Sequence, residues 1–443
     1  MTSRLLAAAV LLASVLIAWL AISFTLAARI LQGAIGVSML YVGYLAWRGW
    51  RAMRDPLRAA ASGAGVATGD ASGLPRVTVV VPARNEASVI GGAVADLGRQ
   101  AYADAAGPRF DVLVVDDGST DGTGGQARAA AAPFGDRVRV VRREPGSGPP
   151  TKAAVLSFAQ PYLSGDVLAT LDADARLAPD FLERVMRAWQ RDAGAAAIQA
   201  QRRVLNAASG WLAEAQDEEL LMDMASQCGR WATDGTAELR GNGMFLRRSA
   251  LEAVGGWDER AITEDLDIST RLAEAGERVT LAPEAEVREE AVEQLRPLWT
   301  QRLRWAEGSL RRLMERGPGL VVDSRLPLGR RVDFLVFVGE FVIPPLFATA
   351  TAASLLTVAL PQRADWSVPL ALVVGYGLGT FLLGLAGIAA HGVRGLPLLG
   401  RALRGALFLS HWLVVVPAAL LRICFGPRTV AFAQTPRVGR TVG

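Results

Sequence analysis

Residues 112–121 read VLVVDDGSTD, and this stretch indicates the class of fold more directly than any other part of the chain. Four apolar residues, three of them β-branched, predict a buried strand at Val112–Val115. The polar residues that follow predict a turn where the strand ends. A helical stretch from about Gly122 comes next. This order is typical of one strand–helix unit in a parallel α/β sheet.

The same order recurs on both sides of this stretch. Val77–Val81 predicts a strand, followed by a helix at Ala87–Gln100. Two further β-branched runs, Val138–Val141 and Val167–Leu171, predict the third and fourth strands in chain order. Strands that alternate with helices predict an α/β domain with a mostly parallel sheet. Ligands of such sheets bind beyond the carboxyl ends of the strands, so we expect the chemistry in the residues that follow each run.

Three of these predicted strands end in polar residues suited to binding a ligand. In chain order these residues are Asn85 and Glu86, which follow Pro82, then Asp116 and Asp117, then Asp172 and Asp174. A single Asp-Gly is usually a turn or a helix cap. Two pairs of acids at equivalent strand ends, however, require a cation to offset their repulsion. An Asp-x-Asp pair offers hard oxygen ligands to Mg²⁺ or Mn²⁺, and such an ion in turn binds a diphosphate.

The two ends of the chain are far more apolar than its middle. Of 443 residues, 51% are hydrophobic and only 20% are charged, and the long uncharged runs lie within 1–54 and 332–443. This composition is too apolar for an ordinary soluble enzyme. Residues 55–331 form a charged block long enough to bury its own core. The sequence therefore predicts an integral membrane protein with one globular domain. Cys228 and Cys424 are the only cysteines, which excludes a disulfide scaffold.

Two apolar runs near the N-terminus, Leu5–Ala28 and Ile30–Trp47, are each long enough to cross about 30 Å of hydrocarbon. Arginines follow at positions 48, 51, 54 and 58. The positive-inside rule then predicts a multi-pass protein of the cell's inner (plasma) membrane with its globular domain in the cytoplasm. A cleaved signal peptide is excluded, because the first run is too long and a second run follows directly.

The C-terminal end contains three apolar runs, Val332–Leu360, Val368–Ala390 and Gly405–Leu421. Pro344 and Pro345 predict that the first run is broken or lies partly at the interface. The predicted organisation of the chain is two transmembrane helices at 1–54, a flexible linker at 55–75, a globular α/β domain at 76–290, interfacial helices at 291–331, about three transmembrane helices at 332–425, and a tail at 426–443.

Several other nucleotide-binding classes do not fit the sequence. The Gly-rich stretch GSGPPTK at 146–152 is not a Walker phosphate loop, because Thr151 precedes Lys152 and Ala153 follows it. No G-x-G-x-x-G follows the first strand, so a nicotinamide cofactor is not favoured. The chain lacks a block of basic residues interleaved with aromatic ones, so nucleic acid is not an expected partner.

The motifs between residues 76 and 315, taken in their order and spacing, resemble the membrane-bound family-2 glycosyltransferases, whose nucleotide-sugar domain has the GT-A fold. They are PARNE at 82–86, DDGSTD at 116–121, a lone lysine opening the third helix, DAD at 172–174, ED at 264–265 and QRLRW at 301–305. The resemblance implies an inverting hexosyltransferase that uses a UDP-sugar with Mg²⁺ or Mn²⁺.

On the donor side, the resemblance implies that Asp117 binds the uracil, with Asp116 beside it. Asp174 would hold the metal ion on the diphosphate, assisted by Asp172. The remaining nucleotide-sugar contacts would come from Pro82, Asn85, Glu86 and Lys152. The departing diphosphate is anionic, so cations at this position stabilise the transition state.

On the acceptor side, the resemblance implies that Asp265, with Glu264 beside it, is the general base that removes a proton from the acceptor hydroxyl. Such a base needs to lie about 3 Å from that hydroxyl. Taken alone, two acids at the start of a helix would be explained by the helix dipole. The acceptor and the diphosphate would also meet Gln301, Arg304, Trp305, Gly241 and Asn242.

Two kinds of acceptor fit the motifs. ELRGNGMFLRR at 238–248 and HWLVV at 411–415 resemble the cyanobacterial-type β-monoglucosyldiacylglycerol synthases, which transfer glucose from UDP-glucose to diacylglycerol. Thr263-Glu264-Asp265 instead has the form found in cellulose synthases. About five spans are few for enclosing a polymer channel. A lipid acceptor is therefore favoured, and a processive polysaccharide synthase of the cellulose, hyaluronan or poly-N-acetylglucosamine type is the alternative. An inactive nucleotide-sugar-binding regulator is disfavoured, because all the acids are present.

Overall fold

The computed structural model describes residues 2–62, 75–322, 326–358 and 366–427. Residues 63–74 of the linker predicted at 55–75, and residues 428–443 of the tail predicted at 426–443, lie outside the described residues. The chain forms two compact units. The sheet unit comprises the described parts of Met53–Leu220 and Thr236–Leu298, and the helical unit comprises those of Met1–Ala52, Leu221–Gly235 and Trp299–Thr429.

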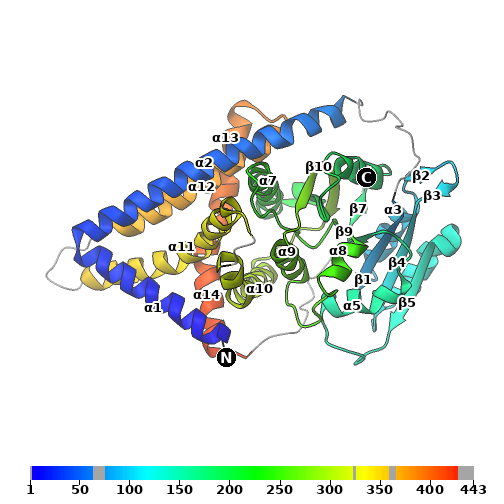
Figure 1. The fold of residues 1–443 in the computed structure, drawn as a ribbon, viewed down its shortest axis with the longest axis horizontal. Helices are drawn as coiled ribbons and strands as arrows, with labels where there is room; N and C mark the ends of the chain where they lie inside the picture. Colours follow the sequence, from blue (N-terminus) through cyan, green and yellow to red (C-terminus); the bar gives the residue numbers. More distant parts are fainter. Residues whose placement is uncertain (1, 63–74, 323–325, 359–365, 428–443) are drawn as a thin grey trace. The chain divides into compact units, whose positions relative to one another are not determined.

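The described part of the sheet unit contains one large, mostly parallel sheet with the strand order β5-β4-β1-β6-β9-β8-β10-β7 (Figure 1). β1, β4, β5 and β6 run parallel to one another, β9 is antiparallel to β6 and β8, and β10 is parallel to β8. Its strands are β1 (Val77–Ala83), β4 (Phe110–Asp117), β5 (Val138–Arg143), β6 (Val167–Thr170), β7 (Arg176–Leu177), β8 (Ala197–Val204), β9 (Met244–Arg247) and β10 (Val279–Glu289). β2 (Ala103–Asp104) and β3 (Gly107–Pro108) form a separate short hairpin.

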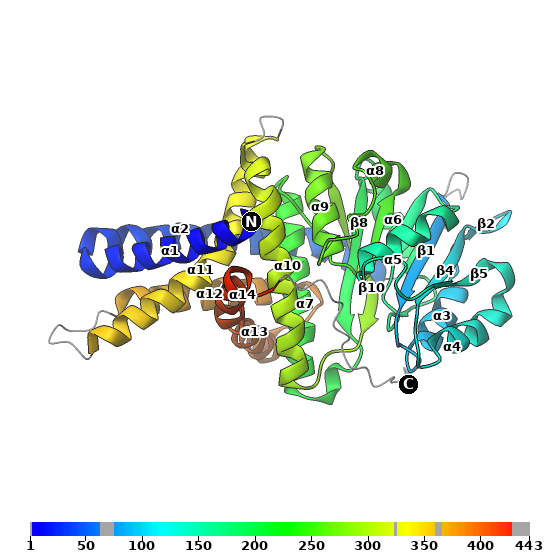
Figure 2. The ribbon, with the colours of Figure 1, turned by 90° about the horizontal axis from the view of Figure 1, so that it is seen from below.

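Alternate residues of each strand enter two different hydrophobic cores. In β1, Val79 and Val81 join one core and Val80 joins the other, because successive side chains point to opposite faces of a sheet. The first core includes apolar residues of α3 (Ile90–Gly98), α4 (Thr123–Ala131) and α6 (Phe181–Gln190). The second includes those of α5 (Lys152–Ala159), α8 (Arg248–Ala253) and α9 (Glu264–Glu274). Figure 2 shows α3 and α4 together beside β1 and β4.

The four predicted strands are present, with differences at their ends. β4 continues to Asp117, beyond the predicted end at Val115, because Asp116 and Asp117 still pair with residues of β5. α3 begins at Ile90 instead of Ala87. The residues before it form a turn, in which Asn85 has a φ of 52° and the Ala87 N–H donates to Asp121 Oδ2 at 3.0 Å.

Five stretches of the described chain are long and apolar enough to cross a membrane: Ser3–Ser23, Thr25–Ala61, Leu328–Leu356, Ser367–Ala390 and Gly395–Phe425. They correspond to α1 (Thr2–Ser23), α2 (Thr25–Ala61), α11 (Leu328–Val358), α12 (Ser367–Ala390), and the pair α13 (Gly395–Leu409) and α14 (Trp412–Phe425). The other long helices are α7 (Trp211–Ala232) and α10 (Leu295–Val322).

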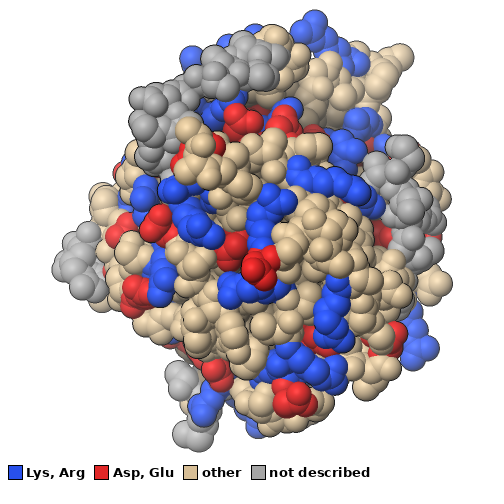
Figure 3. Space-filling view, turned by 90° about the vertical axis from the view of Figure 1, so that its right-hand side faces the viewer, with Lys and Arg blue, Asp and Glu red and all other residues tan. Residues whose placement is uncertain are grey.

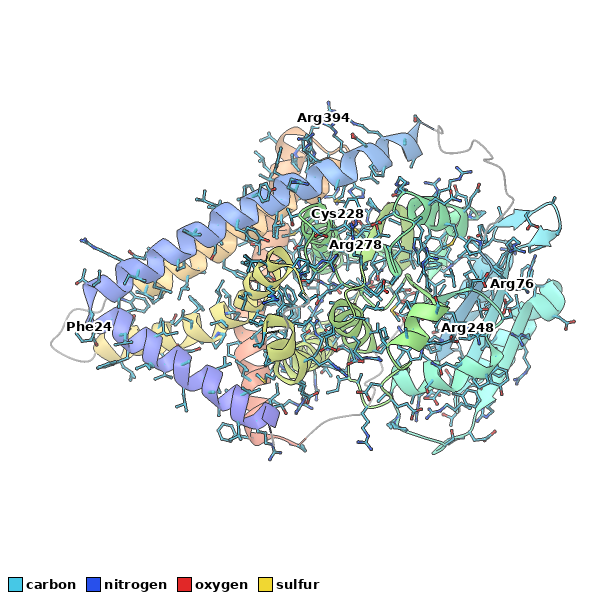
Figure 4. All side chains as sticks on the ribbon, viewed as in Figure 1. Phe24, Arg76, Cys228, Arg248, Arg278 and Arg394 are labelled. Carbon is cyan, nitrogen blue, oxygen red and sulfur yellow. The ribbon has the colours of Figure 1, made fainter. Side chains whose placement is uncertain are left out.

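α1 and α2 separate at Phe24, slightly more than one turn before Arg29, the residue that divides the two predicted apolar runs (Figure 4). Arg29 lies inside α2. An arginine near the end of a membrane helix can extend its charged group to the interface, so it need not end the helix. α2 continues to Ala61, into the stretch whose composition predicts a linker.

Two of the C-terminal runs differ from the prediction. α11 is one helix through Pro344 and Pro345, where a break was one of the two alternatives expected. Neighbouring helices and local adjustments make proline tolerable in membrane helices. The last run is instead divided at Ser410 and His411, between α13 and α14. His411 Nδ1 lies 2.6 Å from the Phe408 carbonyl oxygen, so the break uses the histidine side chain locally.

α2 and α7 approach each other closely at two glycines. A Cβ on Gly49 would overlap the carbonyl oxygen of Ala225, and a Cβ on Gly229 would overlap that of Leu45. Small residues at such positions allow membrane helices to pack backbone against backbone. In this part of the helical unit, the two glycines therefore determine how closely the helices pack.

Candidate active site

Three strand ends bring the predicted acids to one rim of the sheet. β1 lies between β4 and β6 and is parallel to both, so their carboxyl ends point the same way. Asp116 and Asp117 end β4, and Asp172 follows β6 after one residue. This is the rim at which ligands bind in open α/β sheets.

Arginine side chains neutralise the first pair of acids. Asp117 accepts hydrogen bonds from Arg143 Nη1 at 2.5 Å and from Arg84 Nη1 at 3.2 Å. Asp116 accepts from Arg142 Nη1 at 2.9 Å. The sequence predicts a cation near these acids but does not identify these arginines as that cation. The feature of the sequence that would have indicated Arg142 and Arg143 is their position directly after the predicted third strand.

Acidic and basic side chains are interspersed on the face of the molecule that Figure 3 presents. The ion pairs of the sheet unit agree with this pattern, for example Arg176 with Asp96 at 2.7 Å and Arg203 with Asp217 at 2.8 Å.

The turn after β1 is joined to the turn after β4 by hydrogen bonds. Asn85 Oδ1 accepts from the Thr120 N–H at 2.9 Å, and the Asn85 N–H donates to Ser119 Oγ at 3.0 Å. The Glu86 N–H donates to Thr123 Oγ1 at 2.8 Å. Pro82 lies within β1, opposite Val115. Asn85 therefore supports the geometry of the rim, in addition to any contact that it makes with a nucleotide.

Lys152, the only lysine of the chain, lies among three acids, Asp172, Glu264 and Asp265, which we call the acidic cluster. It is the first residue of α5, after Thr151, whose Oγ1 accepts from the Ala154 N–H and caps the helix. Its Nζ lies 2.6 Å from Asp172 Oδ1 and 3.3 Å from Glu264 Oε1. Burial acts to lower the pKa of Lys152, but the Asp172 and Glu264 carboxylates outweigh it and the pKa is raised. The ammonium group is therefore charged at neutral pH.

Glu264 and Asp265, two acids of this cluster, begin α9. Asp265 Oδ1 accepts from the Leu266 N–H at 2.9 Å. A Cβ on Gly241, whose φ is +78°, would lie 3.3 Å from Asp265 Oδ2. Burial, followed by the charge of Glu264, raises the pKa of Asp265 to about 6. A carboxylate with a pKa near the working pH is suited to act as a general base.

Asn242 lies beside this cluster, and its side-chain amide forms hydrogen bonds with Asp172 and Glu289. Its Oδ1 accepts from the Asp172 N–H at 3.1 Å, and its Nδ2 donates to Glu289 Oε2 at 2.9 Å. Glu289, at the end of β10, also forms an ion pair with Arg202 at 2.6 Å. Burial acts to raise the pKa of Glu289, but Arg202 outweighs it and the pKa is lowered. The sequence does not identify Glu289 or Arg202, because neither lies in a recognisable motif.

The D-x-D turn (Asp172–Asp174) suits a metal site in which a bound substrate supplies the remaining ligands. Asp174 is buried and its Oδ2 accepts from the Glu290 N–H at 3.0 Å, whereas the Asp172 side chain is 34% exposed. Within the described residues, no three His, Cys, Asp or Glu side chains gather closely enough to hold a metal ion by themselves. Mg²⁺ typically binds one or two carboxylates together with substrate phosphates. The two aspartates fit a metal ion of that kind.

Gln301, Arg304 and Trp305 lie on α10, in the helical unit, whereas the acids belong to the sheet unit. Between them, Arg302 is buried, and its guanidinium lies 4.3 Å from the Trp305 ring centroid. The same guanidinium lies 5.8 Å from the ring centroids of Phe408 and Trp412. This motif therefore also has a packing role within the helical unit. Its predicted role toward the diphosphate and the acceptor stays a prediction.

Comparisons with known proteins identify the family of the chain. Residues 75–308 match the family described as "Glycosyltransferase like family 2". The chain is 32% identical to the β-monoglucosyldiacylglycerol synthase of Synechocystis sp. over 83% of this chain and 76% of that protein. It is equally similar to the enzyme of the same name from Nostoc sp., over 83% and 77% of the two chains.

The fold also matches a solved structure, a mannosyltransferase from Pyrobaculum calidifontis in complex with GDP-Man and Mn²⁺. The TM-score is 0.60 at 22% sequence identity, with 89% of this chain and 98% of that chain covered. The predicted GT-A fold and the predicted resemblance are thus confirmed. This protein belongs to glycosyltransferase family 2 and is a sugar-transferring enzyme.

Proposed function

We propose that the enzyme transfers glucose from UDP-glucose to the hydroxyl group of a membrane lipid such as diacylglycerol, with inversion at the anomeric carbon. The observation that carries this proposal is Asp265, a half-buried carboxylate at the start of α9 with a pKa raised to about 6. It lies in one cluster with Lys152 and the D-x-D turn.

In this reaction Asp265 accepts the proton of the acceptor hydroxyl as the hydroxyl oxygen forms a bond to the anomeric carbon. The bond from that carbon to the diphosphate breaks, and its electron pair leaves with UDP. Burial and then the charge of Glu264 keep the pKa of Asp265 high, and Lys152 forms an ion pair with Glu264. A single base acting on one face of the sugar gives inversion.

The donor would bind at the rim formed by β1, β4 and β6. Asp117 would bind the uracil with Asp116 beside it, and Pro82 in β1 and Asn85 and Glu86 in the turn that follows would lie next to them. Asp172 and Asp174 would hold Mg²⁺ or Mn²⁺, and the ion, when bound, would neutralise charge on the departing diphosphate. The Mn²⁺ in the related mannosyltransferase structure supports this proposal. From α10, Arg304 would meet the diphosphate, while Gln301 and Trp305 would line the acceptor side.

A lipid acceptor is supported by the relatives and by the helices. The similar enzymes from Synechocystis and Nostoc are named for a monoglucosyldiacylglycerol product, which is a glycosylated lipid. Five candidate spans provide an attachment to the bilayer, where such an acceptor resides. The arginines that follow the second apolar run support an inner-membrane protein with its active site facing the cytoplasm.

The test uses full-length protein in membranes with Mg²⁺, diacylglycerol and radiolabelled UDP-glucose, followed by partition between chloroform and water. We expect label in the organic phase, and none with Asp265→Asn. Asp136→Asn, the same change at an exposed carboxylate, is the matched control and should retain activity. Label in a polymer would support a polysaccharide synthase instead. No product with UDP-glucose, but product with another nucleotide sugar, would correct the donor.

A further inference from the structure

The end of β10 holds both acids of the D-x-D turn by hydrogen bonds. The Glu290 N–H donates to Asp174 Oδ2 at 3.0 Å. The preceding residue, Glu289, accepts from Asn242 Nδ2 at 2.9 Å, and Asn242 Oδ1 accepts from the Asp172 N–H at 3.1 Å. Glu290 therefore contacts Asp174 directly, and Glu289, the last residue of β10, contacts Asp172 through Asn242.

The partners of Asn242 determine which way its amide faces. The Asp172 N–H can only donate, so the amide oxygen must face it. The ionised Glu289 carboxylate can only accept, so the amide nitrogen must face that side. The amide cannot turn over without losing both bonds, and therefore Glu289 controls which atom Asn242 presents to Asp172.

Glu289 itself has little freedom to move. Arg202 donates to both of its oxygens, from Nη2 at 2.6 Å and from Nε at 3.1 Å. The two residues lie on the neighbouring parallel strands β8 and β10. A bidentate arginine–carboxylate pair adds directional restraint as well as attraction. The backbone of Asn242 is restrained too, because its carbonyl oxygen accepts from Gln199 Nε2 at 2.8 Å.

We propose that Glu289 and Asn242 are positioning residues, which hold the backbone of Asp172 so that its carboxylate can bind the metal ion of the donor complex. The proposal rests on the proposed function only for the metal–diphosphate complex, and is independent of the sugar and the acceptor. It gives Asn242 a supporting role, where the sequence predicts a contact with the diphosphate or the acceptor.

The test exchanges the donor and the acceptor of one hydrogen bond. Asn242→Asp places two carboxylates against each other. Glu289→Gln places two amide nitrogens against each other when the introduced glutamine keeps its oxygen toward Arg202. The double variant N242D/E289Q restores one donor and one acceptor with the direction reversed. In the double variant, the introduced aspartate still presents an oxygen to the Asp172 N–H.

The measurement is Mn²⁺ affinity by electron paramagnetic resonance, with full-length protein in nanodiscs and with UDP or GDP added. Loss of a partner behind a metal ligand typically costs roughly 10–100-fold in metal affinity, and we expect that loss for each single variant. We expect the double variant to recover most of the affinity. The Michaelis constant for the donor should follow the same order. Thermal unfolding of each variant shows whether the protein is folded.

A double variant that is folded but binds Mn²⁺ no better than Asn242→Asp would overturn the proposal. So would single variants that unfold at lower temperature while binding Mn²⁺ as wild type does, because the role would then be structural only. Failure of the wild type to bind Mn²⁺ with either nucleotide would overturn both this proposal and the donor site. Normal Mn²⁺–nucleotide binding without glycolipid product would overturn only the proposed acceptor or sugar.

Discussion

Lys152 Nζ lies 2.6 Å from Asp172 Oδ1, so the only lysine of the chain is the counter-ion of the first acid in the D-x-D turn. The same ammonium group lies 3.3 Å from Glu264 Oε1. One cation thus links the turn that is suited to a metal ion with the acidic start of α9.

Lys152→Met should reduce sugar transfer by roughly 10²–10³-fold, the usual cost of removing one preorganised charge from an active site. Mn²⁺ binding in the absence of nucleotide should instead become tighter, because no ammonium group then competes for Asp172. Radiolabel transfer and paramagnetic resonance measure the two effects. Lys152→Arg keeps the charge and is the matched control. Weaker Mn²⁺ binding by Lys152→Met would show that the lysine does not compete with the metal.

The pH dependence of kcat/KM should report Asp265. The base must be deprotonated, and burial with the Glu264 charge raises the pKa of Asp265 to about 6. Activity should therefore rise with pH through about 6 and be lost below it, because the protonated carboxyl group cannot accept the proton of the acceptor. Initial rates from pH 5 to pH 8 at subsaturating donor measure this (roughly the range in which such a group titrates). A profile that is flat across pH 6 would exclude Asp265 as the base.

Gly241→Ala should lower activity while the protein stays folded. Gly241 has a φ of +78°, and a Cβ there would lie 3.3 Å from Asp265 Oδ2. The matched control is Gly146→Ala, since Gly146 has a φ of +80° and no heavy atom within 4 Å of its Cβ position. Both alanines adopt an unfavourable backbone conformation that costs about 1–3 kcal/mol. Only in Gly241→Ala does the added methyl group crowd the Asp265 carboxylate, so equal activity in the two variants would contradict this account.

Arg143→Met should destabilise the protein far more than Arg84→Met. Both arginines bind Asp117, but the Arg143 side chain is 5% exposed and that of Arg84 is 42% exposed. Removing a buried partner costs up to roughly 3–5 kcal/mol because it leaves a buried charge behind. An exposed pair contributes about 0–1 kcal/mol. Thermal unfolding with and without UDP compares the two, and equal shifts would show that burial does not distinguish these pairs.

Much of the fold and part of the site can be predicted from local sequence. Short β-branched runs form buried strands wherever they occur, and so VLVVDDGSTD predicts a strand that ends in acids. The start of α9 at Glu264 and of α5 at Lys152 is also local, because capping and dipole effects act within one turn. Runs of uncharged residues predict the membrane helices, because the thickness of the bilayer determines their length.

The partners of these residues depend on contacts across the chain. Asn242 lies 70 residues from Asp172 and 47 from Glu289. Arg143 lies 26 residues from the aspartate that it neutralises. No periodicity extends over such distances, so the sequence predicts the acids but not the groups that hold them. The break at Ser410 and the continuous helix through Pro344 likewise depend on packing against neighbours.

The sequence by itself determined which residues carry charge, where four strands of the sheet lie, and that apolar ends flank a charged block. The tertiary structure alone decided that Asp116 and Asp117 pair with arginines, that Lys152 lies between Asp172 and Glu264, and that Asn242 connects Asp172 to Glu289. The physical reason is the sequence separation over which each effect acts. Backbone preferences and hydrophobic periodicity act over a few residues, whereas a hydrogen bond or an ion pair needs atoms within about 3–4 Å, and only folding brings distant residues that close.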